Sequence, residues 1–197
     1  MIAAVKHSLA NLANFSGRDA RSTFWLYMLF LVILKMVAFA ISQWPIWTAL
    51  MAGAMDAARA GVDPDEMNQA MLAGVSGDDL RRALYIGTLA AFAGAALYAA
   101  SFVRRLHDSG KAWWWLLVAL VPFLYPHIIS ILDVERTVAV AKSGLEASPS
   151  QAELGERARQ YIYSGIGLLG YLVTIIFGVL ESDDGPNKYG EQPVSLG

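Results

Sequence analysis

The chain of 197 residues contains no cysteine, so it cannot form a disulfide, a thiolate metal site or a cysteine nucleophile. Charged residues are also scarce, at 16% of the sequence, whereas an ordinary soluble domain carries about 25%. The formal net charge of −2 is too close to zero to indicate binding of nucleic acid. Residues 1–23 lack the continuous apolar core of a secretory signal, so we expect no cleavable leader.

Apolar sequence is what the chain has in abundance. Hydrophobic residues make up 56% of it, and the mean hydropathy is +0.43. They gather in four runs, at about residues 24–44, 83–103, 112–132 and 161–180. Each run is close to the roughly 20 residues that a helix needs to cross about 30 Å of hydrocarbon. Hydrocarbon offers the backbone no hydrogen-bond partners, and the runs lack the alternation of barrel strands, so we predict an all-α integral membrane four-helix bundle.

The remaining segments predict short amphipathic and connector helices within a single membrane domain, residues 1–197. Apolar residues recur at steps of three and four in residues 1–15, namely Ile2, Val5, Leu9 and Leu12. This spacing predicts a helix that either lies at the membrane interface or packs on the protein. Two polar connectors follow, residues 51–82 and 133–160, and the tail is 181–197.

The two connectors contain signals for helix starts. "VDPDEM" and "VSGDDL" each place a capping residue, Asp63 or Ser76, three positions before an acidic residue, so a short helix is expected before the second span. In the second connector, "KSGLEASPS" is expected to be irregular, and "QAELGERARQ" predicts a polar helix that runs into the fourth span.

The stretch "RRLHDSGKAWWW", residues 104–115, joins a basic segment to three tryptophans. Tryptophan and tyrosine favour the level of the headgroups, so this run indicates the edge of a span; an aromatic cage for a quaternary ammonium group is a less favoured alternative. Outside the four predicted spans, seven lysines and arginines lie on each side of the membrane, so the total count does not decide the orientation. The three cations in the short hinge 104–111 decide the orientation, because short loops follow the positive-inside rule, and both termini are then cytoplasmic.

Three polar segments fall on this cytoplasmic side: "FSGRDAR" at 15–21, "RRLHDSGK" at 104–111 and "DDGPNKYG" at 183–190. Their cationic side chains could together bind a phosphate or an anionic lipid headgroup, because guanidinium forks match such oxygens; the candidates are Arg18, Arg21, Arg104, Arg105, His107 and Lys111. The carboxylates of Asp108, Asp183 and Asp184 could instead pair with these arginines and hold the segments together.

A simpler alternative gives the central segment only a structural role. Gly110 could end the second spanning helix as its C′ residue. Asp108 or Ser109 would then cap the third spanning helix, and His107 would fill space at the interface. Catalysis is not favoured, because no nucleophile elbow surrounds Ser109.

The blocks "FSGRDARSTFWLYMLF", "FVRRLHDSGKAWWWLL" and "DDGPNKYGEQP" occur in this order. Together they resemble the domain of unknown function 805 (DUF 805) family of small multi-span bacterial inner-membrane proteins. The resemblance implies a multi-pass protein of the bacterial inner membrane and no particular reaction, since the activity of the family is not established. The two long connectors depart from the compact form common in that family.

Two titratable residues lie inside predicted spans. Trp25 and Trp44 bracket Lys35, which places its ammonium group roughly 15 Å from the inner interface. None of the four spans contains an aspartate or glutamate. Lys35 and His127 could line a hydrated cavity or a proton path, or Lys35 could be tolerated inside the bundle. Small residues in "GTLAAFAGAALYAAS" and "GIGLLG" predict close contacts between helices, within the bundle or in a homodimer.

These features favour a non-catalytic membrane protein whose arginine-rich cytoplasmic face binds anionic lipid headgroups or a partner protein. A small transporter or channel subunit that uses Lys35 and His127 is the alternative. Membrane lipids, a second copy of the chain or another membrane protein are the expected partners, and we expect no metal, no cofactor and no nucleic acid.

The predicted topology can be tested by thiol labelling, because any introduced cysteine is the only thiol in the chain. Cysteines at positions 111 and 184 should react with an impermeant reagent from the cytoplasmic side of the membrane, and a cysteine at position 56 from the opposite side. Labelling of positions 111 and 184 from opposite sides would contradict the four-span arrangement.

Overall fold

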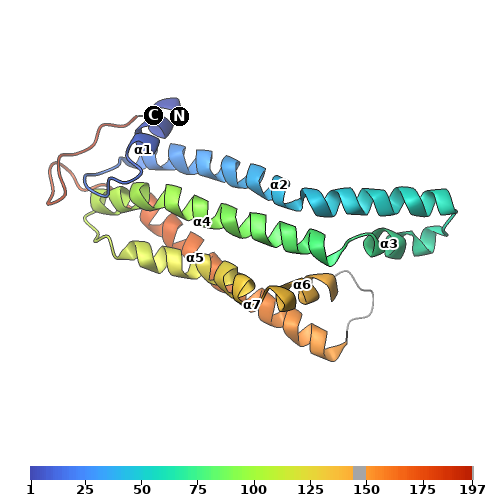
Figure 1. Cartoon of the computed structure of the whole chain (residues 1–197). Helices are drawn as coiled ribbons and strands as arrows, with labels where there is room; N and C mark the ends of the chain where they lie inside the picture. The colour runs from blue at the N-terminus through green and yellow to red at the C-terminus, as the bar shows by residue number, and fades with distance from the viewer. Residues whose placement is uncertain (144–149, 197) are drawn as a thin grey trace. The chain divides into compact units, whose positions relative to one another are not determined.

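The computed structural model describes residues 1–143 and 150–196. Within them it contains seven helices and no strand (Figure 1). They are α1 (Ile2–Ala10), α2 (Arg21–Ala60), α3 (Pro64–Ala73), α4 (Gly77–Asp108), α5 (Trp115–Leu132), α6 (Val134–Ser143) and α7 (Gln151–Val179). Four of these, α2, α4, α5 and α7, are long and apolar enough to cross a membrane, which confirms the predicted all-α membrane architecture. Most of "KSGLEASPS", residues 144–149, lies outside the described residues.

The chain divides into two compact units, and each long helix contributes to both. The first unit comprises residues 1–36, 91–126 and 165–197, and it contains both termini. The second unit comprises residues 37–90 and 127–164.

Helix α2 is longer than the sequence predicted. The apolar run ends near residue 44 and a polar connector was expected from residue 51, but the helix continues through Pro45 to Ala60. The helix continues because membrane helices tolerate an interior proline, and because the alanine-rich stretch that follows has high helix propensity. Gly61 then ends the helix: its φ is +67°, and the Val62 N–H donates to the Ala57 carbonyl at 3.1 Å.

Reciprocal capping boxes start two of the long helices. At the start of α4, the Asp79 N–H donates to Ser76 Oγ at 3.2 Å, and the Ser76 N–H donates to the Asp79 carboxylate at 3.1 Å. Ser150 and Glu153 make the same exchange at the start of α7. The predictions of a helix start at Ser76 and of a polar helix leading into the fourth span are confirmed.

Two details of the remaining helices differ from the sequence predictions. Helix α6, which begins after the capping residue Asp133, was not predicted. Helix α5 begins at Trp115 rather than at residue 112. Neither proposed cap serves it: Asp108 binds guanidinium groups, and Ser109 Oγ donates to the Leu106 carbonyl at 3.2 Å. The cap prediction was therefore wrong.

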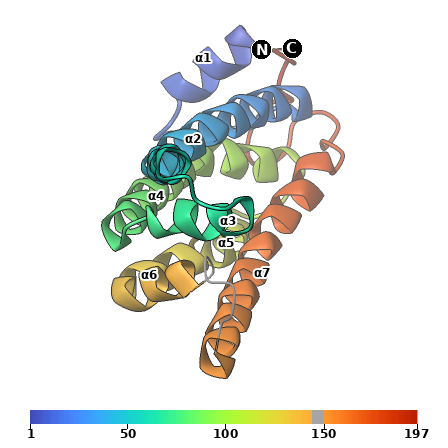
Figure 2. The same cartoon turned by 90° about the vertical axis from the view of Figure 1, so that its right-hand side faces the viewer.

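In the second unit, α3 packs back against the last part of α2 (Figure 2). Gly53 makes this possible, because a Cβ atom there would lie 2.8 Å from the Met71 carbonyl oxygen. Val75, Leu80 and Val138 form the buried apolar cluster of this unit.

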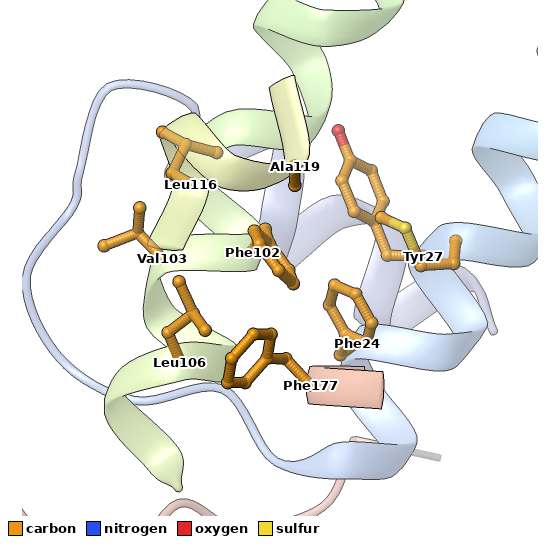
Figure 3. Close-up of a cluster of buried hydrophobic side chains, with 9 residues drawn as sticks. Phe24, Tyr27, Phe102, Val103, Leu106, Leu116, Ala119 and Phe177 are labelled. Carbon is orange, nitrogen blue, oxygen red and sulfur yellow. The ribbon is translucent and has the colours of Figure 1, made fainter. Parts of the chain in front are cut away.

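In the first unit, aromatic and aliphatic side chains of α2, α4, α5 and α7 form the core (Figure 3). Helix α1 lies against this unit with Ala4 and Ser8 buried, while Ile2 and Leu9 remain exposed. The buried face is what the alternative of a helix packed on the protein predicts, and a position at the membrane interface stays a prediction.

The glycines of "GIGLLG" bring α7 against α5, as predicted. A Cβ atom at Gly167 would lie 3.1 Å from Pro126 Cγ, and one at Gly170 would overlap the Ala119 carbonyl and lie 3.0 Å from the Phe123 backbone nitrogen. A Cβ atom at Gly165, five residues before Gly170, would meet no described atom within 4 Å.

We therefore expect Gly170→Ala to destabilise the protein by about 1–3 kcal/mol, because the backbone of α5 must move to admit the methyl group. The free energy of unfolding in detergent, from denaturant titration, measures the effect. Gly165→Ala is the control on the same helix and should be neutral or slightly stabilising. Equal losses in the two variants would contradict the close contact at Gly170.

Candidate functional site

The three polar segments meet at the end of the first unit that carries both termini (Figure 1). The last turns of α4 run through the middle of this region, and residues 101–109 are all buried. On these turns Phe102 and Leu106 contact the hydrophobic core, while Arg104, Arg105 and Asp108 contact the polar loops. The loop 11–20 and the tail 180–196 supply most of the remaining partners. We call Arg18, Asp19, Arg104, Arg105 and Asp108 the arginine–aspartate cluster.

Asp108 is the first centre of the cluster, and its side chain is fully buried. One carboxylate oxygen accepts from Arg18 Nε at 3.1 Å and forms an ion pair with Arg18 Nη2 at 3.0 Å. The other accepts from Arg105 Nη1 and from Ser182 Oγ. The negative charge of Asp108 is thus fully compensated by two guanidinium groups. Through these contacts, Asp108 joins the loop before α2 to the tail after α7.

Asp19 is the second centre. Its Oδ1 accepts from Arg104 Nε at 3.0 Å and contacts His7 Nε2 at 3.0 Å, and its Oδ2 accepts from Ser101 Oγ at 3.2 Å. The Asp19 N–H also donates to the Arg104 carbonyl at 3.1 Å. This centre therefore fixes α1 and the loop 11–20 to the end of α4.

Backbone carbonyls satisfy most of the other guanidinium donors. Arg18 donates to the carbonyls of Gly185 and Asp183, both at 2.6 Å. Arg104 Nη1 donates to the carbonyls of Asn11 and Asn14, and Arg105 donates to those of Gly178 and Leu180. Arg104 Nη2 is buried without a partner among the described residues. The exposed fractions of Arg18, Arg104 and Arg105 are only 8%, 3% and 0%, so these side chains are occupied inside the chain.

His107 contacts partners other than its neighbour Asp108. Its ring stacks on Tyr189 with centroids 3.8 Å apart and an interplanar angle of 6°. Its Nδ1 lies 3.2 Å from the Gly17 carbonyl oxygen. The Asn187 side chain donates to the His107 carbonyl at 2.9 Å. The imidazole thus packs the tail onto α4.

Gly110 is the C′ residue of α4, as predicted: its φ is +68°, and the Lys111 N–H donates to the Leu106 carbonyl at 2.8 Å. A Cβ atom here would also lie 2.7 Å from Asp183 Oδ2, so the Asp183 carboxylate would have to shift.

The other candidate residues lie at the edge of the cluster. Asp183 is beside Arg18, but its backbone carbonyl is the acceptor, and its carboxylate accepts from Asn187 at 2.9 Å. Asp184 is exposed. Arg21 and Lys111 are exposed as well, and Arg21 Nη1 reaches the Val179 carbonyl at 3.5 Å. The structure thus places Arg18, Arg104, Arg105 and Asp108 inside the cluster and Arg21, Lys111 and Asp184 at its surface.

Lys35 and His127 belong to different units. Lys35 extends from α2 to aromatic side chains of α5 and α7 in the first unit: its ammonium donates to the Tyr171 hydroxyl and lies over the rings of Tyr171 and Phe123.

Sequence reasoning missed Asp19, His7, Ser101, Ser182, Asn187 and Tyr189 as members of the site. The available signal was the carboxylate within each basic segment: Asp19 in "GRDAR" and Asp108 in "RRLHD". A carboxylate among arginines beside an apolar span indicates a compensated, buried charge.

The geometry fits a structural role better than acid–base catalysis. Asp108 is held by two guanidinium groups, so it is not positioned to orient His107, and Ser101 and Ser182 donate to carboxylates. Within residues 1–143 and 150–196, no three His, Asp or Glu side chains gather as metal ligands would.

Four apolar spanning helices and a polar assembly at the helix ends define a multi-pass membrane protein. Residues 12–191 match the family described as protein of unknown function (DUF805), so the chain belongs to this family. The match includes the whole arginine–aspartate cluster and leaves out α1. Comparison with curated proteins and with solved structures finds no match.

Asp108→Asn should destabilise the protein by about 3–5 kcal/mol, because it leaves Arg18 and Arg105 buried without a countercharge. Denaturant titration in detergent measures the free energy of unfolding. Asp184→Asn makes the same change of charge on the exposed tail and should leave stability within about 0.5 kcal/mol of the wild type. Similar values for the two variants would show that the buried carboxylate is dispensable.

Proposed function

We propose that the protein is a non-catalytic membrane protein whose arginine–aspartate cluster holds the helix ends together. Around the cluster, the exposed cations Arg21 and Lys111, which we call the cationic rim, engage anionic lipid headgroups. One observation carries this proposal: the buried arginines are occupied inside the chain, while Arg21 and Lys111 remain exposed. Headgroup contact is therefore assigned to the exposed cations, and Arg18, Arg104, Arg105 and His107 are assigned to structure.

The distribution of charge supports this assignment. Outside Lys35 and the arginine–aspartate cluster, the first unit carries four cations and four acidic residues, whereas the second unit carries seven against eleven. The less acidic first unit includes the hinge after α4 and both termini. Anionic lipids of the cytoplasmic leaflet attract basic segments by about 1 kcal/mol per cation. We propose that the protein lies in the bacterial inner membrane with both termini in the cytoplasm, so that Arg21 and Lys111 face that leaflet.

Transport is less well supported. The transport hypothesis joined Lys35 and His127 in one polar path. The contacts of Lys35 with Tyr171 and Phe123 indicate a fixed aromatic environment rather than a hydrated path.

Neutralising the exposed cations should weaken the preference for anionic lipid. We expect Arg21→Gln and Lys111→Gln each to lower the relative association constant for phosphatidylglycerol over phosphatidylcholine about fivefold, which corresponds to the loss of one cation near the surface. Quenching of tryptophan fluorescence by brominated lipids measures this constant, because Trp25 and Trp113 lie close in sequence to the two cations.

Lys142→Gln is the matched control, since it neutralises an exposed lysine of the second unit. It should leave the lipid preference unchanged. A preference that survives the Arg21→Gln, Lys111→Gln double variant, or that falls equally in the control, would remove headgroup binding as the function of this rim.

A further inference from the structure

Lys35 is the one cation inside the predicted spans, and three helices build a site around it. Its ammonium nitrogen donates to the Tyr171 hydroxyl and lies 4.6 Å from the centroid of that ring. It also lies 5.2 Å from the centroid of the Phe123 ring. The two rings pack edge to face at 5.3 Å. Cation–π contacts of this kind stabilise an ammonium group, most strongly where water is absent.

The site is also open to the surroundings of the bundle. Lys35 is exposed in the structure, and so are aliphatic neighbours on α2 and α7, including Val32, Met36, Leu168 and Leu172. The close approach of α5 and α7 at Gly170 places Phe123 beside Tyr171. The result is a polar spot in an apolar, lipid-facing surface.

The hydrogen-bonding capacity of this spot is incomplete. An ammonium group has three donors, and the Tyr171 oxygen accepts one of them. Because that oxygen is an acceptor here, the Tyr171 O–H can donate elsewhere. The free donors are therefore on the Lys35 ammonium and the Tyr171 hydroxyl. A negatively charged group that only accepts hydrogen bonds, such as a carboxylate, can bind both of them.

We propose that Lys35 and Tyr171 form an intramembrane docking site for a helix of a partner membrane protein that carries an aspartate or glutamate near the middle of its span. A second copy of this chain cannot supply that group, because the four predicted spans contain no aspartate or glutamate. A lipid phosphate does not fit the depth, since Lys35 is ten residues from Trp25, or about 15 Å along the helix. The exposed aliphatic side chains around the spot provide the apolar contact surface for such a helix.

A designed probe tests the site without knowledge of the natural partner. The probe is a single transmembrane helix of leucine and alanine with one central glutamate, and matched helices carry glutamine or leucine at that position. Full-length protein labelled at an Asp184→Cys substitution is reconstituted with a labelled probe in phosphatidylcholine vesicles. Energy transfer between the labels measures association. A zwitterionic lipid keeps this experiment independent of headgroup binding at the cationic rim.

For the wild-type protein we expect the glutamate helix to associate about tenfold more strongly than the leucine helix, as a polar contact between membrane helices allows. Lys35→Leu should abolish this preference and Lys35→Arg should retain it. Tyr171→Phe should weaken it, because the phenolic donor is lost. Lys142→Leu is the control, because it makes the same substitution at an exposed lysine outside the predicted spans, and it should behave as the wild type.

The probe series remains decisive if Lys35→Leu fails to fold, because the change from glutamate to leucine leaves the protein untouched. Equal association of the glutamate and leucine helices with the wild-type protein overturns the proposal. A preference that persists in folded Lys35→Leu also overturns it. Lys35-dependent association between copies of the chain, without any preference for the glutamate helix, assigns the site to a homodimer and equally overturns it.

Discussion

Two buried carboxylates hold the first unit together. Asp19 and Asp108 compensate three guanidinium groups that are almost completely removed from solvent. Burial of a guanidinium group is tolerable only when opposite charge and hydrogen-bond acceptors are supplied together. Here the acceptors come from the loop before α2, the end of α4, the end of α7 and the tail. These segments therefore cannot separate without leaving a charge unpaired, and the helix ends are tied to one another by that constraint.

The last turns of α4 contribute side chains to both the hydrophobic core and the arginine–aspartate cluster. Phe102 and Leu106 pack among aromatic side chains of α2 and α7, while Arg105 and Asp108 bind the loops. Functional groups are then distributed at two depths with different solvation. Arg21 and Lys111, near the ends of α2 and α4, are exposed, as the proposed contact with headgroups requires. Lys35, about 15 Å further along α2 from Trp25, has aromatic rings and a phenol in place of water.

Hydropathy was sufficient to predict the helical class and the four spans, because each apolar run is long and free of acidic residues. Hydropathy did not predict where α2 ends. Pro45 and the polar residues after it suggest the end of a helix, but α2 continues through them to Ala60. The arginines were recognised from their motifs, and both ligand binding and pairing with Asp108, Asp183 or Asp184 were left open. Local sequence does not reveal burial, and Arg18 meets Asp108 across 90 residues of chain. The carboxylate inside each basic motif was the clue, and in "GRDAR" it was overlooked.

Most of the acceptors of Arg105 lie far after it in the sequence, so they are synthesised later than the arginine. Arg105 bonds to Gly178, Leu180 and Ser182, which are translated 73 to 77 residues after it. At about 5–20 residues per second, the ribosome needs about 4–15 s to supply them. Until then Arg105 lacks these acceptors, so the first unit closes only when the final segment has been made. A nascent chain released before residue 178 would insert its apolar runs, yet it would lack the acceptors that close this end of the protein.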